Sequence, residues 1–305
     1  MSKLVTILGP TATGKTRLAA LAASRINGEI ISADSRQVYK GMDIGTGKDL
    51  DDYTVDGKKV PYHLIDIVEP GYEYNVFEFQ KDFLKAFYGI IDRNRQPLLC
   101  GGSGLYIASV LSGYRFSQVP ENKELRKTLN TLSHARLIDI LKKYGKLHNT
   151  TDTTDRERTI RAIEIKEYEK NHSNETLFPE IDSLNIGIFF ERSELRKRIT
   201  LRLENRIENG LVQEVETLLK KGLKPAQLTF YGLEYRYVTL YLTGKIDFRT
   251  MFEKLNTAIH QFAKRQTTWY RRMEKQGTKI HWIDGMLPEK EKLSRCLQLI
   301  NKEQR

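Results

Sequence analysis

The chain has 305 residues, 39% of them apolar, which is enough for one large domain or two smaller domains with a real core. The chain has 50 Lys and Arg residues against 39 Asp and Glu residues. The resulting net charge of +11 favours a polyanionic partner such as nucleic acid over a merely solvated basic surface. Two cysteines, Cys100 and Cys296, exclude a disulfide framework and a zinc cluster, and no apolar run approaches the ~20 residues that span a bilayer. We therefore expect a cytoplasmic protein, without membrane contact, that acts as a monomer.

Short apolar runs that alternate with helical stretches predict an α/β fold, with a parallel sheet covered by helices. The expected strands are Lys3–Leu8, Glu29–Ala33, Pro97–Cys100, Asn185–Phe190 and a short final strand at Lys279–Ile283. Thr16–Ser24 is packed with Ala and Leu and predicts a helix directly after the first strand. Thr250–Gln276 predicts the longest helix of the chain.

Two segments interrupt this alternation. Asp56 and Gly57 are flanked by strand-forming residues in Tyr53–Tyr62, which predicts a hairpin outside the sheet. Between 119 and 182 helical patterns dominate, so we expect a helical insertion domain there. The predicted organisation is thus a first core part at 1–118, the insertion at 119–182, and a second core part with basic C-terminal helices at 183–305.

A phosphate-binding loop follows the first predicted strand. Its spacing, G-x-x-x-x-G-K-[ST], is met by Gly9, Gly14, Lys15 and Thr16, between a strand and a helix as the motif requires. Backbone amides and the helix N-terminus would bind a diphosphate or triphosphate, Lys15 would neutralise its charge, and the Thr16 hydroxyl would reach a Mg²⁺ ion. The loop predicts a P-loop NTPase-like core, and by itself it would indicate nucleotide binding, most often of ATP.

Polar residues follow two more of the predicted strands. Asp34 comes directly after Glu29–Ala33, and Ser103 follows Pro97–Cys100 within a Gly-rich turn. Because ligands of open parallel sheets bind at the carboxyl ends of the strands, both should face the phosphate loop. Asp34 would then accept a proton or hold Mg²⁺ through water, and Ser103 would orient a nucleophile or donate to a phosphate. The alternatives are a cap on the next turn for Asp34 and a simple tight turn around Ser103.

Basic residues concentrate in the insertion, in 192–206 and on the long C-terminal helix. On that helix the basic stripe has three-, four- and seven-residue spacings, which place its members on one face. The stripe comprises Lys264, Arg265, Thr268, Arg271, Arg272 and Lys275. It predicts a track for an RNA backbone, with a solvated face as the alternative.

The motifs GPTATGKT, ISADSRQVYKGMDIGTGK, VPYHLIDIVEP, CGGSGLYI, IRAIE and AKRQTTWYRR occur in this order, and together they resemble the signature of tRNA dimethylallyltransferases. The resemblance covers most of the chain, and ADSRQVYKGMDIGT is its most specific part. It implies transfer of a dimethylallyl group from dimethylallyl diphosphate to the exocyclic amine of the adenosine 3′-adjacent to the anticodon. The tRNAs would be those that read codons beginning with U, and diphosphate would leave.

The resemblance also implies roles for individual residues. The catalytic set would be Asp34 as the proton acceptor, Ser103, Lys15 and Arg202, with Mg²⁺ near Thr16. The diphosphate would bind to Gly9, Pro10, Thr11, Ala12, Thr13, Gly14, Lys15 and Thr16. The anticodon stem-loop would contact Asp34, Ser35, Arg36, Gln37, Ser103, Arg126, Glu157, Arg158, Thr159, Ile160, Arg161, Gly232, Tyr235, Arg236, Lys264 and Arg265.

The chain departs from the family pattern at three places. Ser103 replaces the usual Thr and keeps the hydroxyl, the stretch His148–Thr151 replaces His-Pro-Asn-Asp, and Glu234 precedes Tyr235 where the family has Gly. Other readings of the same motifs are a P-loop kinase of a nucleotide or small metabolite, with the insertion as a lid, and a prenyltransferase that acts on free adenine nucleotides. A non-catalytic RNA-binding protein with a vestigial loop is the third.

Overall fold

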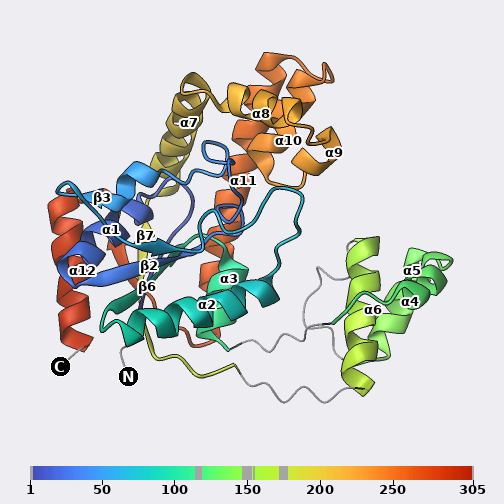
Figure 1. The fold of residues 1–305 in the computed structure, drawn as a ribbon, viewed down its shortest axis with the longest axis horizontal. Helices are drawn as coiled ribbons and strands as arrows, with labels where there is room; N and C mark the ends of the chain where they lie inside the picture. Colours follow the sequence, from blue (N-terminus) through green and yellow to red (C-terminus); the bar gives the residue numbers. More distant parts are fainter. Residues whose placement is uncertain (1–2, 114–118, 146–152, 154, 172–177, 304–305) are drawn as a thin grey trace. The chain divides into compact units, whose positions relative to one another are not determined.

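The computed structural model describes residues 3–113, 119–145, 153, 155–171 and 178–303 (Figure 1). The chain forms two compact units: unit 1 comprises Met1–Gly113 and Glu180–Arg305, and unit 2 comprises Tyr114–Pro179. The second unit is therefore an insertion in the first. Its helices are described separately below.

A six-stranded parallel sheet forms the centre of unit 1, in the order β5-β2-β6-β1-β7-β8. The residues of β1 and β2 are fully buried, as expected for strands covered on both faces. The predicted α/β fold class is confirmed. The strands are β1 Leu4–Leu8, β2 Gly28–Ala33, β5 Tyr62–His63, β6 Gln96–Gly101, β7 Ser183–Phe189 and β8 His281–Asp284.

Helices cover both faces of this sheet (Figure 1). On one face α1 (Lys15–Arg25) packs on β1, β2 and β6, and α12 (Glu289–Glu303) packs beside it on β7 and β8. On the other face α2 (Val76–Asp92) packs on β2 and β6 and contacts α3 (Gly104–Leu111). The core therefore lies on both sides of β1 and β6, the two central strands.

The predicted hairpin is confirmed, but the end of its segment behaves differently. β3 (Thr54–Val55) and β4 (Lys58–Lys59) pair antiparallel in a sheet of their own, with Asp56 and Gly57 at φ of 49° and 73°. These positive values are those of the turn that an Asp-Gly pair favours. Tyr62, which was expected in the hairpin, instead begins β5 and pairs in parallel with β2 at the sheet edge.

A group of helices follows β7 (Figure 1). They are α7 Arg192–Glu208, α8 Leu211–Lys220, α9 Pro225–Leu228, α10 Leu233–Leu242 and α11 Phe248–Lys275. The longest, α11, contacts α10, α7 and α3, so it connects this group to the helices on the sheet. The chain then returns to the sheet as β8, as the sequence predicts.

Unit 2 contains three helices in the part of the chain that is described. They are α4 Lys123–Asn130, α5 His134–Lys142 and α6 Arg156–Asn171, and both α4 and α5 pack against α6. A small apolar core of its own holds them together, formed by Leu129, Leu137, Leu141, Ile160 and Ile163. The sequence places the insertion at 119–182, and the compact unit covers 114–179.

Candidate active site

The loop Gly9–Thr16 joins β1 to α1 at the carboxyl edge of the sheet. Gly14 caps α1 with φ of 75°, and Ala12 also has a positive φ of 64°, so the chain reverses tightly here. A side chain at Gly9 would lie 3.0 Å from the carbonyl oxygen of Ile188 on β7, which explains why only glycine fits. The N-terminus of α1 thus presents its backbone amides to an anion.

Two of the predicted site residues at this loop are cations, Lys15 and Arg202. Burial lowers the pKa of the Lys15 ammonium, the positive charge of Arg202 lowers it further, and the Asp34 carboxylate raises it. Arg202 extends from α7, donates from Nη1 to Thr11 Oγ1 at 3.2 Å, and forms an ion pair with Asp49. The structure therefore brings Lys15, Arg202 and Asp34, all predicted site residues, to one place.

Asp34 and Ser103 follow neighbouring strands, β2 and β6, whose last residues are paired in register. The Ser103 backbone N–H donates to the Ala33 carbonyl at 3.2 Å, and its hydroxyl oxygen accepts from the Ser35 backbone N–H at 3.1 Å. Asp34 Oδ1 accepts from the Arg36 backbone N–H at 2.9 Å. The Asp34 carboxylate therefore caps a turn at this edge, and that role leaves Oδ2 available for a substrate.

The phosphate loop and the Ser103 loop are joined by two side chains of α11 whose role at the site was not predicted. Gln266 accepts from the Thr11 backbone N–H at 2.9 Å and donates to the Gly102 carbonyl at 2.7 Å. One turn later, Tyr270 donates to the carbonyls of Gly9 at 3.1 Å and of Gly102 at 3.3 Å. Both side chains are buried. Their four-residue spacing on the face opposite the basic stripe is the signal that would have found them.

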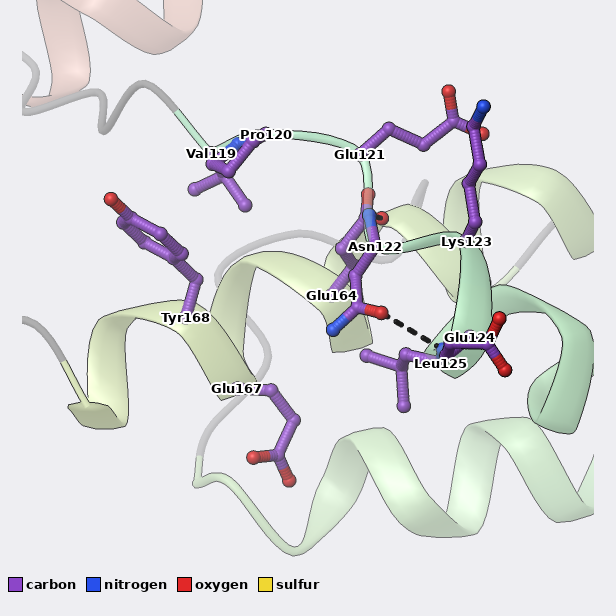
Figure 2. Close-up of a pocket in the computed structure, with 10 residues that line it drawn as sticks. All are labelled: Val119, Pro120, Glu121, Asn122, Lys123, Glu124, Leu125, Glu164, Glu167 and Tyr168. Carbon is purple, nitrogen blue, oxygen red and sulfur yellow. Dashed lines mark hydrogen bonds between the residues drawn. The ribbon is translucent and has the colours of Figure 1, made fainter.

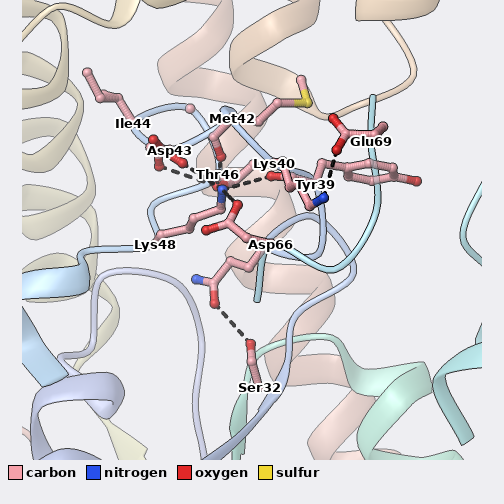
Figure 3. A network of polar contacts seen from close by, with 12 residues as sticks. Ser32, Tyr39, Lys40, Met42, Asp43, Ile44, Thr46, Lys48, Asp66 and Glu69 are labelled. Carbon is pink, nitrogen blue, oxygen red and sulfur yellow. Dashed lines mark hydrogen bonds and ion pairs between the residues drawn. The ribbon is translucent and has the colours of Figure 1, made fainter. Parts of the chain in front are cut away.

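A buried lysine holds the loop that follows Asp34 (Figure 3). Lys48 is 1% exposed, and its ammonium donates to the Tyr39 carbonyl at 2.7 Å, to Asp43 Oδ1 at 2.6 Å and to Asp66. Three oxygen acceptors satisfy its three donor positions. Lys48 therefore stabilises the loop from inside.

Gln37 belongs to the same loop, and its side chain points inward. Its Oε1 accepts from the Ser32 hydroxyl at 2.9 Å, and its Nε2 donates to the Gly47 carbonyl at 3.0 Å. The side chain is buried, so it does not present its amide to RNA, as the resemblance implied. We assign Gln37 to shaping the loop that carries Asp34.

The residues predicted on α10 separate into buried and exposed groups. Gly232 is the N-cap of α10, with φ of 136°. Tyr235 is fully buried and donates its hydroxyl to Glu214 Oε1 at 2.6 Å, so its ring is a packing element and not a surface contact. Arg236, the next residue, is exposed.

 The Arg236 guanidinium thus lies over the Tyr237 ring, 5.7 Å from its centre, and remains open to a phosphate.

The basic stripe lies on the exposed face of α11. All six of its members are exposed, while Gln266 and Tyr270 between them are buried. Lys264 and Arg265, the two stripe residues predicted to contact RNA, therefore present their charges to solvent. The two faces of α11 thus have separate roles: one holds the phosphate loop, and the other carries positive charge.

In unit 2 the predicted RNA contacts Arg126 and Arg161 converge on one buried carboxylate. Arg126 binds Glu164 with both ends of its fork, at 3.0 Å and 2.9 Å, and Arg161 pairs with the same residue while donating to the Val119 carbonyl at 2.7 Å. Burial by itself raises the pKa of Glu164, but the hydrogen bonds from Arg126, the Asn122 amide and Arg161 outweigh it and hold the pKa below its usual value. Glu164 thus fixes both guanidinium groups, each of which keeps an exposed side.

The other predicted residues of α6 divide in the same way. Glu157 and Arg158 are exposed, whereas Thr159 and Ile160 are buried in the core of unit 2. We therefore assign Thr159 and Ile160 to packing, and of these residues Glu157 and Arg158 are the ones that face solvent. The stretch 148–151, where the sequence departs from the family pattern, lies outside the described residues.

A cavity of about 590 Å³ opens beside Glu164 in unit 2 (Figure 2). It is bounded by the start of α4 and by α6, and four of its ten lining residues are glutamates. Its lining residues are Val119, Pro120, Glu121, Asn122, Lys123, Glu124, Leu125, Glu164, Glu167 and Tyr168. These carboxylates would repel a phosphate, so the cavity differs from the loop at Gly9–Thr16 in the ligand that its charges favour.

The residues around Thr16 fit a magnesium ion that binds together with a phosphate. Thr16 lies in the first turn of α1 with a half-buried side chain, next to Lys15, which senses the Asp34 carboxylate. Mg²⁺ takes few protein ligands and fills its shell with phosphate oxygens and water, so it needs no cage of carboxylates. Within the described ranges no group of three His, Cys, Asp or Glu residues is placed to hold a metal.

No helix in the described part of the chain is both long enough and apolar enough to cross a bilayer.

Comparisons with protein families, related sequences and solved structures all relate this chain to one family of transferases. The profile of the IPP transferase family matches residues 37–273. The chain is 55% identical over 292 residues to "tRNA dimethylallyltransferase 2" of Bacteroides fragilis, covering 95% of each, and 54% identical over 299 residues to the protein of that name from Phocaeicola vulgatus, covering 98% and 97%. A tRNA isopentenylpyrophosphate transferase from Bacillus halodurans superposes with a TM-score of 0.71 at 30% identity, over 100% of this chain and 98% of the other.

Proposed function

Because this chain belongs to the IPP transferase family, we propose that it transfers a dimethylallyl group from dimethylallyl diphosphate to the exocyclic amine of a tRNA adenosine. The acceptor is the adenosine 3′-adjacent to the anticodon, in tRNAs that read codons beginning with U. Diphosphate is the second product. The observation that carries the proposal is the meeting of Asp34, Lys15 and Arg202 at one edge of the sheet, beside the Ser103 loop.

The leaving diphosphate accounts for the cationic side of the site. As the bond between carbon and the diphosphate oxygen breaks, its electron pair moves onto that oxygen. Negative charge therefore grows where the loop amides, Lys15 and Arg202 converge, and such preorganised charge stabilises the transition state. Thr16 would hold a Mg²⁺ ion, which would add positive charge beside the diphosphate.

The acceptor amine accounts for the opposite side of the site. An aromatic amine is a weak nucleophile, and its nitrogen forms the new bond to the allylic carbon while it loses one proton. Asp34 accepts that proton through Oδ2, because Oδ1 already accepts from the Arg36 backbone. The Ser103 hydroxyl, which is held by the Ser35 amide, orients the amine.

The tRNA accounts for the basic surfaces. We assign the anticodon stem-loop to Arg126, Arg158 and Arg161 in unit 2, with Arg236, Lys264 and Arg265 in unit 1. The adenosine has to leave the base stack to reach Asp34, as targets of base-modifying enzymes do. The protein acts in this role as a cytoplasmic monomer.

One incubation tests the proposal against its rivals. The protein is mixed with radiolabelled dimethylallyl diphosphate and unmodified tRNA, and in parallel with ATP and a panel of nucleotides. Label that enters the RNA and maps to the adenosine beside the anticodon supports the proposal. Phosphate transfer to a small acceptor without labelled RNA would make the protein a kinase, and label in free adenine nucleotides would make it a nucleotide prenyltransferase.

A further inference from the structure

An aromatic ring stands exposed beside the loop that carries Asp34. Phe230 is 44% exposed, and the guanidinium of Arg36 lies over its ring, 5.0 Å from the ring centre. Arg36 is fixed in turn by its backbone hydrogen bond to Asp34. The pair therefore lies next to the proton acceptor of the proposed reaction.

The ring of Phe230 rests on a buried aromatic support. It contacts Tyr231 edge-on at 5.5 Å, and Tyr231 contacts Tyr39 in the same way at 4.7 Å. Both tyrosines are buried, and the Tyr231 hydroxyl accepts from the Gly71 backbone N–H. An exposed ring held from below in this manner keeps its orientation and presents its free surface to solvent.

In RNA-binding proteins, unstacked bases lie on planar guanidinium groups and on exposed aromatic rings. Arg36 and Phe230 place one of each side by side. The Arg36 charge also attracts the RNA backbone. We propose that Arg36 and Phe230 form a stacking platform for an unpaired base that neighbours the reacting adenosine in the tRNA loop. This inference rests on the proposed function, and it identifies Phe230 as a binding residue that neither the motifs nor the resemblance indicated.

The test replaces the ring while keeping an apolar side chain, as Phe230→Leu, and uses Phe230→Tyr as the conservative variant. If one base stacks on the ring, Phe230→Leu should raise the tRNA dissociation constant and the KM for tRNA by about 10-fold. Phe230→Tyr, which keeps an aromatic ring, should give wild-type values. KM for dimethylallyl diphosphate should not change, because the ring does not touch the phosphate loop. Phe248→Leu is the matched control, since Phe248 is 45% exposed and lies at the start of α11.

A second variant and a second readout make the result independent of folding. Arg36→Lys keeps the charge but removes the planar group, so it should weaken tRNA binding as Phe230→Leu does. Anticodon stem-loops that carry 2-aminopurine on either side of the target report stacking directly: the fluorescence response of one label should be lost with Phe230→Leu.

Unchanged tRNA affinity in both variants, or the same loss with Phe248→Leu, would overturn the platform. A 2-aminopurine response that is identical in wild type and Phe230→Leu would do so as well. These outcomes are separate from failure of the proposed function, because that failure appears in the wild-type protein as the absence of any label in RNA.

Discussion

Arg206 of α7 and Glu234 of α10 form an ion pair in which both side chains are largely removed from water. The distance between Nη1 and Oε1 is 3.1 Å, and the side chains are 12% and 15% exposed. Burial lowers the pKa of Arg206 and raises that of Glu234, which is the direction expected when charges lose their hydration. Glu234 thus has a partner for its buried charge on the neighbouring helix.

Removing one member of this pair should destabilise unit 1. Glu234→Gln leaves the Arg206 charge buried without its partner, and we expect a loss of about 3 kcal/mol in the free energy of unfolding, measured by urea denaturation. The double variant Arg206→Met/Glu234→Leu removes both charges and should remain close to wild type. A single variant as stable as wild type would show that the pair is solvated in solution.

Asp34→Asn separates the two roles of Asp34. The amide still accepts from the Arg36 backbone and so keeps the turn, but it cannot take a proton. We expect the rate of transfer to fall by a factor of about 10² to 10⁴, the range for a general base, while tRNA binding is retained. Single-turnover kinetics with saturating tRNA measures this, and a near-wild-type rate would remove Asp34 from the chemistry.

The lowered pKa of Lys15 predicts the pH dependence of diphosphate binding. Lys15 is cationic below its own pKa, so the affinity for inorganic diphosphate should fall as the pH rises, and the fall should begin below the usual lysine value of 10.5. Burial raises the pKa of the neighbouring Cys100 thiol to about 12, so that group titrates later. Lys15→Arg should abolish the alkaline fall in calorimetric titrations, because a guanidinium stays charged.

Acid should destabilise unit 2 through Glu164. Its folded pKa lies below its ordinary value of 4.5, so the carboxylate contributes stability above that value and loses the contribution as the pH falls through the folded pKa. Hydrogen exchange of the α6 amides, corrected for intrinsic rates, should therefore accelerate in acid. Glu164→Gln should remove most of this dependence, whereas Glu169→Gln, in a half-exposed pair with Lys166, should leave it unchanged.

Salt should weaken tRNA binding in proportion to the phosphates that the basic stripe contacts. Each of Lys264→Gln and Arg265→Gln should reduce the slope of log K against log salt by about 1, because each removes one contact that releases a counterion. Arg249→Gln on the same helix is the control, since Arg249 is paired with Glu253. Equal slopes in all variants would remove the stripe from the RNA interface.

Local patterns predicted most of the sheet and the first half of the site. The strand, Gly-rich loop and helix at Lys3–Ser24 follow from short-range rules, and so does the Asp56-Gly57 hairpin, because the residues that decide each structure are neighbours in sequence. β5 was not predicted, since two residues give no period and its partner β2 is 29 or more residues away.

Long-range polar contacts were beyond prediction from one sequence. Gln266 contacts Thr11 across 255 residues, and Lys48 binds acceptors that lie on both sides of β5. Nothing around Lys48 marks it as different from a surface lysine, and the four-residue spacing of Gln266 and Tyr270 predicts a shared face of α11 but not the distant backbone groups that they contact. Likewise, Tyr235 and Gln37 were expected at the RNA because their motifs resemble the family signature, and only the packing around them reveals that their side chains face inward.

The attachment of Gln266 and Tyr270 to the phosphate loop has a consequence for shortened forms of the protein. A chain that ended before residue 266 would keep every residue of the Gly9–Thr16 motif, yet it would lose both side chains that brace the loop against Gly102. Proteolysis or a premature stop before residue 266 should therefore abolish diphosphate binding even though the motif survives intact. In this protein the integrity of the first site along the chain depends on residues near its end.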